Sequence, residues 1–446
     1  MVLDFHSGVG LFWQFLRYYN ADFNRENIQM NFKKIIINAI ALVTLLAFSS
    51  CQNMTIDPAD EDTKTPDTDT SQTNESNEAE DFPAEIMGGG DLLPDGVLVN
   101  TDNGVGLIYL DANGQILSEI QTPGIGFADP ENVAIAGTVI PGQPLPPIIY
   151  RGWEPEGALL INTNGQTSTL RLTNSFLSLN GAPGQSALSF SEVMISPDNY
   201  PHSFLYAGNI ANLDSVGSFY DLIDEPTYMA LMTIGVEAVS GEPQGVWYTK
   251  TGWGIGGADL IFPITRGLYF FDLTNGDNLQ YIDADRSFQG ISPDLSHAGT
   301  VDFNMAGDRA MTVVNLTNNR KTAFTLDPAS DRGAGFSVFS PNNQFAAWLE
   351  ASGSMISEPS NFHPLVRIGN IQNGSIVKDL VDAAAVQAIN GNRATFMRPV
   401  GWLTNEILLM EVRGQDWGDV SLLSYDVISD GLSLFSSGNF VGFGYQ

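Results

Sequence analysis

Ser340-Pro341-Asn342, followed by the apolar run Phe345-Ala-Ala-Trp-Leu349, is the clearest copy of a turn that recurs along this chain. The same turn stands at Ser292-Pro293-Asp294 and at Ser196-Pro197-Asp198. The spacings are 48 (340 − 292) and 96 (292 − 196), which is twice 48. Proline fixes φ at the second position of a turn, and Asp or Asn tolerates the third. The pattern predicts a repeating unit of about 48 residues built from strands.

Stepping back 48 residues from Pro293 leads to Gly245, inside Pro243-Gln-Gly-Val-Trp-Tyr248. We therefore expect a turn and a following strand there as well. Apolar strands that run into Gly or Asn turns are a second marker of the unit. They occur at Gly106–Leu110, Gly157–Ile161, Gly267–Phe271, Met311–Val314, Leu365–Ile368 and Val420–Leu423, with a less regular seventh at Tyr228–Met232 before Gly235.

Seven such hairpins between about Asp91 and Gln446 give about 51 residues per unit (355 divided by 7). Repeats of roughly 40–50 residues with four short strands each are typical of propeller blades. A single blade cannot bury both faces of its sheet, so blades stack in a ring. We predict an all-β propeller with seven four-stranded blades, with six or eight as alternatives. A strand near Gly96–Asn100 is expected to close the ring by pairing with the last unit.

The Ser-Pro-Asp turns resemble those of the WD40-like and TolB-like β-propeller families. The resemblance covers most of residues 91–446. Where those families have Gly after the Asp, this chain has Asn199, Leu295 or Asn343, which leaves the subfamily open. The families include periplasmic proteins that bind other envelope proteins and the N-terminal domains of some peptidases. The resemblance therefore implies either a binding propeller or a propeller attached to catalysis.

The first 50 residues contain the layout of an export signal. Met30-Asn-Phe-Lys-Lys34 is a short basic segment, Ile35–Phe48 is apolar, and Ser49-Ser50-Cys51 follows. The apolar run is too short for a comfortable membrane-spanning helix. The layout resembles a bacterial lipoprotein signal over residues 30–50, with Phe48 where that pattern has Leu. This resemblance implies lipidation of Cys51 and extracytoplasmic anchoring to the bacterial cell envelope; an ordinary secretory signal with an incidental Cys is the alternative.

Two further segments flank this signal. Residues 1–29 precede a suitable start at Met30, and we interpret them as an over-extended N-terminus. Residues 51–90 are rich in Asp, Glu, Thr, Ser and Asn and nearly lack large apolar residues. Such a composition cannot bury enough surface to offset its ordering entropy, so it predicts a disordered acidic linker. It would tether the propeller to the membrane.

Composition narrows the possible partners. The formal net charge is −32, from 51 acidic and 19 basic residues. An acidic surface repels phosphate backbones, so we expect no nucleic-acid partner. One cysteine excludes an internal disulfide, and His6, His202, His297 and His363 lack metal-ligand spacing. We expect no metal and no cofactor, and we place His202 and His297 on the surface in equivalent hairpins.

In an antiparallel blade, the loops between the second and third strands all lie at one end of the ring. We predict that this end carries the ligand site, because these loops vary most. Their aromatic and acidic residues are the candidate ligand contacts: Trp153, Glu154, Trp253, Asp259, Phe362, His363, Asp416 and Trp417. Aromatics beside carboxylates suit a sugar, a peptide or a partner loop. Packing of each Trp between neighbouring blades is the alternative.

Two classes of function remain. The first is a non-catalytic binding or scaffolding propeller for a protein, peptide or glycan. The second is a hydrolase or lyase that uses paired carboxylates from Glu154, Asp259, Asp416 or Asp419 in the central mouth. The chain contains no Gly-x-Ser-x-Gly elbow and no Gly-rich phosphate loop with a following Lys. We therefore expect the first class and no enzymatic activity.

Overall fold

The computed structural model describes most of the chain after residue 91. The described residues are 92–101, 106–121, 133–135, 137–141, 143–151, 158–161, 167–170, 175–195, 201–209, 220–221, 229–252, 262, 265–302, 310–324, 332–352, 362–381, 384–385, 394–414 and 420–446. They belong to one compact unit that takes in Pro83–Gln446. The predictions for the N-terminal extension, the signal peptide, Cys51 and the acidic linker lie outside these residues.

The described strands form seven four-stranded antiparallel sheets. The first is β28 (Asn439–Tyr445), β1 (Pro94–Asn100), β2 (Gly106–Asp111) and β3 (Ile116–Gln121); the second is β4 (Val133–Ile135), β5 (Ile148–Arg151), β6 (Ala158–Ile161) and β7 (Thr167–Leu170); the third is β8 (Ser175–Gly181), β9 (Ala187–Ile195), β10 (Pro201–Asn209) and β11 (Tyr220–Asp221).

The other four sheets follow the same order from inner to outer strand. The fourth is β12 (Met229–Val239), β13 (Glu242–Gly252), β14 (Thr265–Asp272) and β15 (Asn278–Ile282); the fifth is β16 (Arg286–Ile291), β17 (His297–Asp302), β18 (Thr312–Asn315) and β19 (Lys321–Ala323); the sixth is β20 (Arg332–Phe339), β21 (Phe345–Ser352), β22 (His363–Asn370) and β23 (Ile376–Val381); the seventh is β24 (Ala394–Trp402), β25 (Ile407–Gly414), β26 (Val420–Asp426) and β27 (Gly431–Ser437).

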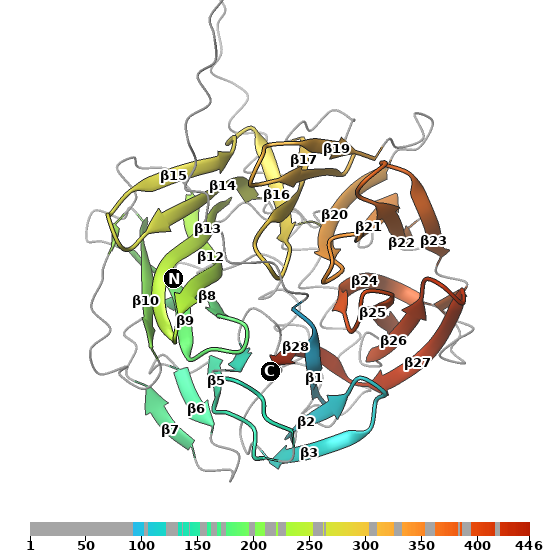
Figure 1. The fold of residues 1–446 in the computed structure, drawn as a ribbon, viewed down its shortest axis with the longest axis horizontal. Helices are drawn as coiled ribbons and strands as arrows, with labels where there is room; N and C mark the ends of the chain where they lie inside the picture. The colour runs from blue at the N-terminus through green and yellow to red at the C-terminus, as the bar shows by residue number, and fades with distance from the viewer. Residues whose placement is uncertain are drawn as a thin grey trace, which may run out of the picture. The chain divides into compact units, whose positions relative to one another are not determined.

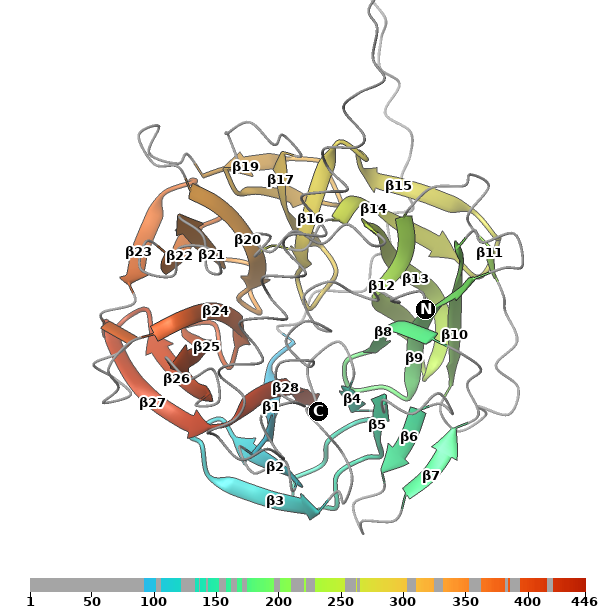
Figure 2. The same ribbon diagram turned by 180° about the vertical axis from the view of Figure 1, so that it is seen from behind.

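These sheets follow one another around a common centre, as both views of the ribbon show (Figure 1, Figure 2). The first-named strand of each sheet is innermost. Successive inner strands lie against each other, for example β28 against β4, β4 against β8, and β20 against β24. The arrangement confirms the predicted all-β propeller.

The ring closes through the two ends of the described chain. β1 pairs with β28 in antiparallel register, from Pro94 opposite Tyr445 to Asn100 opposite Asn439. One sheet thus contains three strands from the beginning of the propeller and one from its end. This confirms the predicted pairing of the strand near Gly96–Asn100 with the last unit. This pairing covers the edge of β1 that faces away from β2, which would otherwise be unpaired.

The repeated turn has a shared internal geometry. In the sixth sheet, the Ser340 Oγ accepts the backbone N–H of Phe345 at 2.9 Å. In the fifth sheet, the Ser292 Oγ accepts that of His297 at 2.8 Å. The residue after the Asp or Asn has positive φ, 60° at Leu295 and 53° at Asn343. Glycine adopts this conformation without steric cost, which explains why the related families place Gly there.

The third copy of the motif proved to be different. The turns at Ser292 and Ser340 connect an inner strand to a second strand, but residues 196–200 connect β9 to β10, the second and third strands of their sheet. The interval of 96 residues is therefore a coincidence, and the predicted equivalence of His202 and His297 is wrong. The turn in the expected place is Ala182–Ser186, where Gly184 has a φ of 66°.

Two other sequence predictions fail in the fourth sheet because its first two strands are unusually long. Tyr228–Met232 was expected to run into a turn at Gly235, yet Gly235 lies inside β12 at a register shift after Thr233. The turn expected at Pro243–Gly245 is instead at Ser240 and Gly241, with φ values of 55° and 83°. A glycine in a strand can mark a bulge as well as a turn, and the sequence pattern does not distinguish them.

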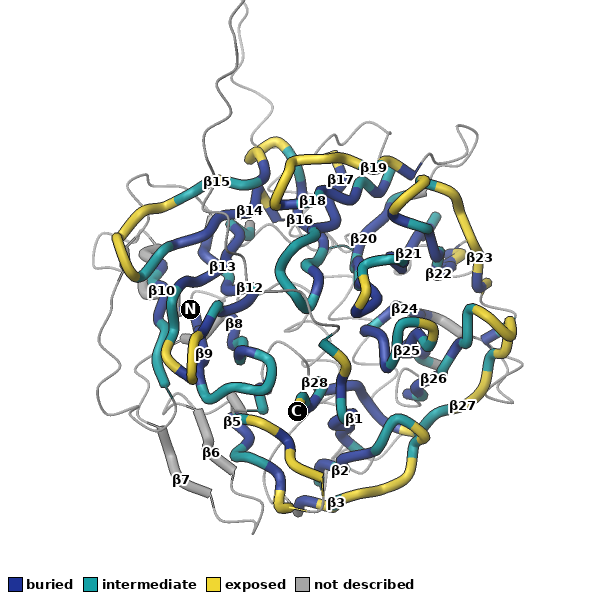
Figure 3. Tube along the Cα trace, in the orientation of Figure 1, coloured by how far each residue is buried: buried dark blue, intermediate teal, exposed yellow. Residues whose placement is uncertain are grey.

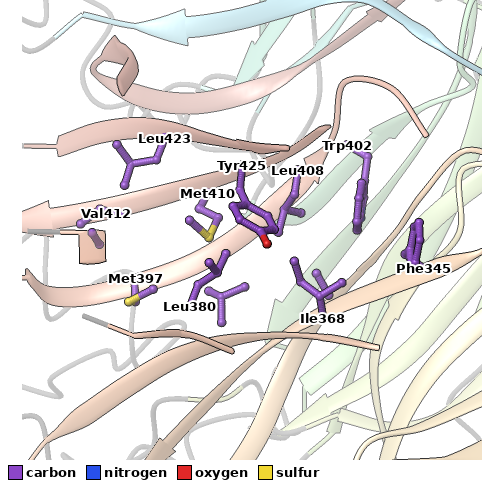
Figure 4. Packing of buried hydrophobic residues seen from close by; sticks show 13 residues of the cluster. Phe345, Ile368, Leu380, Met397, Trp402, Leu408, Met410, Val412, Leu423 and Tyr425 are labelled. Atoms are coloured by element: carbon purple, nitrogen blue, oxygen red, sulfur yellow. The ribbon is translucent and has the colours of Figure 1, made fainter. Parts of the chain in front are cut away.

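The core lies between neighbouring sheets. Figure 3 shows buried inner and middle strands and exposed stretches along outer strands such as β3, β23 and β27. One cluster joins the sixth and seventh sheets through side chains from both (Figure 4). In it the rings of Phe345 and Trp402 stack with centroids 5.9 Å apart. Burial of aromatic and aliphatic side chains between neighbouring sheets, in this and similar clusters, holds the described part of the ring together.

The Ser292 turn also links two sheets and supports a first prediction. Asp294 accepts hydrogen bonds from the Ser292 hydroxyl at 2.6 Å and from the Asn343 amide of the next sheet at 2.7 Å. Although burial opposes it, these bonds and those from Ser296 hold the pKa of Asp294 below its ordinary value. We expect Asp294→Ala to lower the free energy of unfolding by about 1–2 kcal/mol at pH 7, since the group is partly exposed.

The pH dependence follows from the direction of that shift. A carboxylate with a lowered folded pKa stabilises the fold above its unfolded pKa of about 3.9 and loses this effect as the pH falls through the folded value. Urea unfolding at several pH values should therefore show a difference between Asp294→Ala and wild type that shrinks below about pH 4. The exposed Asp285→Ala is the control. An equal loss in both variants contradicts the role of Asp294.

Candidate functional site

Most of the ligand contacts predicted from the sequence lie outside the described residues: Trp153, Glu154, Trp253, Asp259, Asp416 and Trp417. The other two are adjacent. Phe362 is buried, with 3% of its surface exposed, whereas His363 is exposed at the start of β22. The structure thus brings no described pair of these residues together around an opening, and their role in binding stays a prediction.

His297 is not the free surface residue that was expected. Its ring nitrogens lie 2.8 Å from the Ser296 hydroxyl and 3.0 Å from the Asn315 amide. Burial lowers the pKa of this imidazole, partly offset by the charge of Asp294. The residue therefore belongs to the turn network and supports the fold.

The described residues do enclose a cavity that the sequence did not indicate. It has a volume of about 200 Å³ and lies against the inner strands of the first, second, third and seventh sheets. Its wall includes Val133, Leu179, Val400, Phe440 and Val441. These residues come from β4, β8, β24 and β28, so only ring formation assembles the cavity.

Glycines keep part of this wall open. Gly442 in β28 lines the cavity, and a Cβ added there would meet no atom within 4 Å. Gly444, two residues further along the same strand, is packed instead: a Cβ there would come within 2.3 Å of the Tyr109 hydroxyl. The absence of a side chain at Gly442 therefore leaves space in the cavity. Its absence at Gly444 allows β28 to pack closely against Tyr109.

A buried charge cluster lies on β24, β25 and β28, two of which also line this cavity. Glu411 of β25 has no exposed surface and lies opposite Arg398 of β24 in the sheet register. Its Oε1 accepts hydrogen bonds from Arg413 Nε at 3.0 Å and Nη2 at 2.7 Å. Arg398 Nη2 is 3.6 Å from Glu411 Oε2. Arg413 also contacts the side-chain oxygen of Asn439, on β28, at 3.4 Å.

The electrostatics of this cluster favour an ionised carboxylate. Burial alone would raise the pKa of Glu411, but the charges of Arg398 and Arg413 and hydrogen bonds from Arg413 and the Phe440 backbone hold it below its ordinary value. Two arginines against one glutamate leave one excess positive charge. It stands out in a protein whose net charge is −32. A positive group inside an acidic protein attracts an anionic group of a ligand.

Aromatic rings extend the cluster towards the sixth sheet. The Arg398 guanidinium lies over the Phe336 ring, 5.7 Å from its centroid, and Phe262 and Phe396 lie 6.0 and 6.5 Å from the same ring. Phe336 has a φ of 54°, at a register shift in β20. A bulky residue with positive φ costs about 1–3 kcal/mol and is concentrated at functional sites.

We refer to Phe336, Phe396, Arg398, Glu411 and Asn439, together with the cavity beside them, as the central site. Sequence analysis missed it because Arg398 lies in an otherwise ordinary apolar strand. A usable signal was the placement of an arginine between Met397 and Pro399 in a chain with only 19 basic residues. Within the described ranges, no three His, Cys, Asp or Glu side chains are grouped as metal ligands, and no helix has the length and apolarity to cross a membrane.

Comparison with known proteins gives similarities in fold. No protein-family model matches the sequence, and no curated protein matches it. Solved structures do match. The fold is similar to that of TolB-like and prolyl oligopeptidase-type propellers. All of these similarities are below 25% identity and concern the fold alone.

Three of them illustrate the range. TolB from Acinetobacter baumannii is 13% identical, with a TM-score of 0.37, over 66% of this chain and 64% of TolB. A structure from a study of two prolyl endopeptidases is 8% identical, with a TM-score of 0.49, over 78% of this chain and 51% of that one. An oligogalacturonate lyase from Vibrio parahaemolyticus is 10% identical, with a TM-score of 0.46, over 74% and 91%. This chain thus spans less than two thirds of the TolB and prolyl endopeptidase chains.

Proposed function

We propose that this protein is a non-catalytic binding or scaffolding propeller. It lies outside the cytoplasm and is anchored to the bacterial cell envelope by a lipid on Cys51. Each of the seven sheets serves as one blade. The ligand is a protein, a peptide or a glycan, and it binds at the central site. The long loops between second and third strands, with Trp153, Trp253 and Trp417, would contribute further contacts.

The observation that carries this proposal is the open cavity lined by Val400, two residues along β24 from Arg398. Cavities in which a ligand is held are mostly apolar, with a few polar groups that orient it. Here Val133, Leu179 and Val441 provide aliphatic side chains in the wall. Arg398 is a charged group on β24, two residues from Val400, which lines the cavity. The strained Phe336 beside it is a further sign of a functional rather than a purely structural arrangement.

A carboxylate-dependent hydrolase or lyase is the alternative. Such an enzyme needs a general acid that is protonated near neutral pH. Glu411, the carboxylate of the central site, has a lowered pKa and is therefore ionised there. This supports binding over acid catalysis by Glu411. Substitution of Glu154, Asp259, Asp416 and Asp419, with activity measured on peptide and oligosaccharide substrates, would test the alternative.

A plugging variant tests the central site directly. In Gly442→Val the new side chain enters the cavity without a backbone clash, because nothing lies within 4 Å of its Cβ. We expect the protein to keep its melting temperature within a few degrees and to lose more than about tenfold in ligand affinity. The detergent-solubilised wild type and the Gly442→Val variant are each cross-linked to their partners, and the yields of cross-linked partner are compared.

The control is Gly431→Val on the outer strand β27, where the nearest atom is the Ser429 hydroxyl at 3.2 Å. This variant should bind like wild type. If both variants retain every cross-linked partner at wild-type yield, the central site is not the binding site.

Membrane attachment is tested at Cys51. We expect Cys51→Ala to leave the propeller folded and to move the protein from the membrane fraction to the soluble fraction, because the lipid anchor needs the thiol. Fractionation followed by mass spectrometry of the N-terminus checks both points. A mature chain that starts well downstream of residue 51, or a variant that still sediments with membranes, contradicts the anchor.

A further inference from the structure

Arg398 of the central site and the neighbouring Arg413 differ in how their N–H groups are satisfied. Arg413 donates to Glu411 through Nε and Nη2 and contacts Asn439. Arg398 makes no hydrogen bond with any other described residue: its Nε is buried and unpartnered, and its approach to Glu411, at 3.6 Å, is an ion-pair distance. Arg413 thus donates the side-chain hydrogen bonds to Glu411, Arg398 contributes its charge, and the N–H groups of Arg398 remain for another acceptor.

A second unsatisfied donor belongs to Asn439 of β28, whose side-chain oxygen contacts Arg413. Asn439 is 4% exposed, and its side-chain Nδ2 has no partner among the residues described. Burying a donor without an acceptor is costly, so native folds rarely keep several together without a use. Glu411 Oε2 is also buried without a hydrogen-bond partner in the described part of the chain and lies 3.6 Å from Arg398 Nη2. Arg398 Nε and Asn439 Nδ2 remain for a further acceptor.

The cavity and these donors are continuous along two strands. Val400 follows Arg398 by two residues in β24 and lines the cavity. Phe440 follows Asn439 in β28 and also lines it. A ligand whose acceptor group reaches Arg398 can therefore extend along β24 towards the cavity at Val400.

We infer that the central site binds the carboxyl terminus of a peptide chain, with the terminal carboxylate at Arg398 and an apolar last side chain in the cavity. The inference rests on the proposed function and specifies its ligand. Arginine binds carboxylates through two parallel N–H groups, which suits the free donors of Arg398. Capture of a C-terminal carboxylate is a recurring mode of peptide recognition.

The apolar wall favours a peptide over an acidic sugar. A uronic acid also carries a carboxylate, but its ring presents hydroxyl groups that need hydrogen-bond partners. Leu179, Val400 and Val441 offer no such partners through their side chains. The side-chain amide N–H of Asn180, which also lines the cavity, already donates to the Thr233 backbone oxygen. An aliphatic side chain loses nothing against the aliphatic part of the wall. The excess positive charge complements one carboxylate, and every unmodified C-terminus carries one.

The test uses two peptide arrays fixed through their N-termini, one with free C-terminal carboxylates and one with C-terminal amides, and an array of uronic-acid oligosaccharides. Full-length, detergent-solubilised protein is applied to each. We expect binding to peptides that end in Leu, Ile, Val or Phe, and a loss of about tenfold to a hundredfold on amidation. Arg398→Gln should bind acids and amides equally weakly. Arg320→Gln, an exposed arginine on the β18–β19 turn, is the control with the same charge change and should behave like wild type.

The outcomes separate this inference from the proposed function. Equal binding of acids and amides by the wild type overturns the inference, and so does an Arg398→Gln variant that keeps the preference for acids. Binding to the oligosaccharides alone, abolished in Gly442→Val, overturns the peptide inference and leaves a binding propeller. Binding that is unchanged in Gly442→Val overturns the central site itself, and with it both proposals.

Discussion

Replacing Arg367 by methionine is expected to lower the free energy of unfolding by about 3–5 kcal/mol. Glu350 of β21 is 1% exposed, and Arg367 Nη1 lies 3.0 Å from its Oε2. Arg367 Nε also bonds Asp379 of β23 at 2.7 Å, and Trp348 donates to Glu350 at 2.8 Å. Without the arginine, the buried charge of Glu350 loses its counter-ion while it stays shielded from water.

Urea unfolding followed by tryptophan fluorescence and circular dichroism measures the loss. The double variant Arg367→Met/Glu350→Gln is the matched control. Since it removes both charges and keeps an acceptor for Trp348, it should recover at least half of the lost stability. A single variant that loses less than about 1 kcal/mol would show that the pair is dispensable in the sixth sheet.

The second large effect is expected at the closure of the ring. Gly438 connects the outer strand β27 to the inner strand β28 with a φ of 111°, and a Cβ there would lie 2.3 Å from the backbone oxygen of Asn100. Alanine therefore imposes both backbone strain and an overlap with β1, the partner of β28. We expect Gly438→Ala to cost about 2–5 kcal/mol and to lower the melting temperature by several degrees.

Gly276→Ala separates the two contributions. Gly276 has a φ of 81°, but nothing lies within 4 Å of its Cβ position. This variant should show only the conformational cost of about 1–2 kcal/mol. Differential scanning calorimetry of both variants gives the comparison. If Gly438→Ala loses no more stability than Gly276→Ala, the pairing of β1 with β28 tolerates the overlap and closure does not depend on this glycine.

The turns between third and outer strands were predicted well from the sequence. Asn113-Gly114, Asn275-Gly276 and Asn373-Gly374 all mark turns between third and outer strands, because positive φ is required there and few residues adopt it. The errors arose where the same local signals served another purpose. Gly235 marks a bulge within β12, and Ser196-Pro197-Asp198 joins the second and third strands of its sheet.

The central site could not be predicted in this way. Its residues come from β4, β8, β20, β24, β25 and β28, and no interval along the chain relates them. Arg398 and Glu411 are opposite each other only through the register of β24 and β25, which a bulge shifts after Pro399. Asn439 reaches Arg413 only after the last strand has paired with the first.

By itself, the sequence determined the strand-and-turn repeat, the all-β propeller, and the pairing that closes its ring, since turn chemistry and alternating apolar strands act over a few residues. The tertiary structure alone decided that Gly442 opens a cavity while Gly444 allows close packing. It also decided that Arg413 donates hydrogen bonds to Glu411 while the N–H groups of Arg398 remain without a hydrogen-bond partner among the described residues. Gly442 and Gly444 have the same residue type and lie two positions apart in one strand. Arg398 and Arg413 also share their residue type and lie in neighbouring strands. Their different roles depend on atoms contributed by other sheets, and those atoms come together only when the ring has formed.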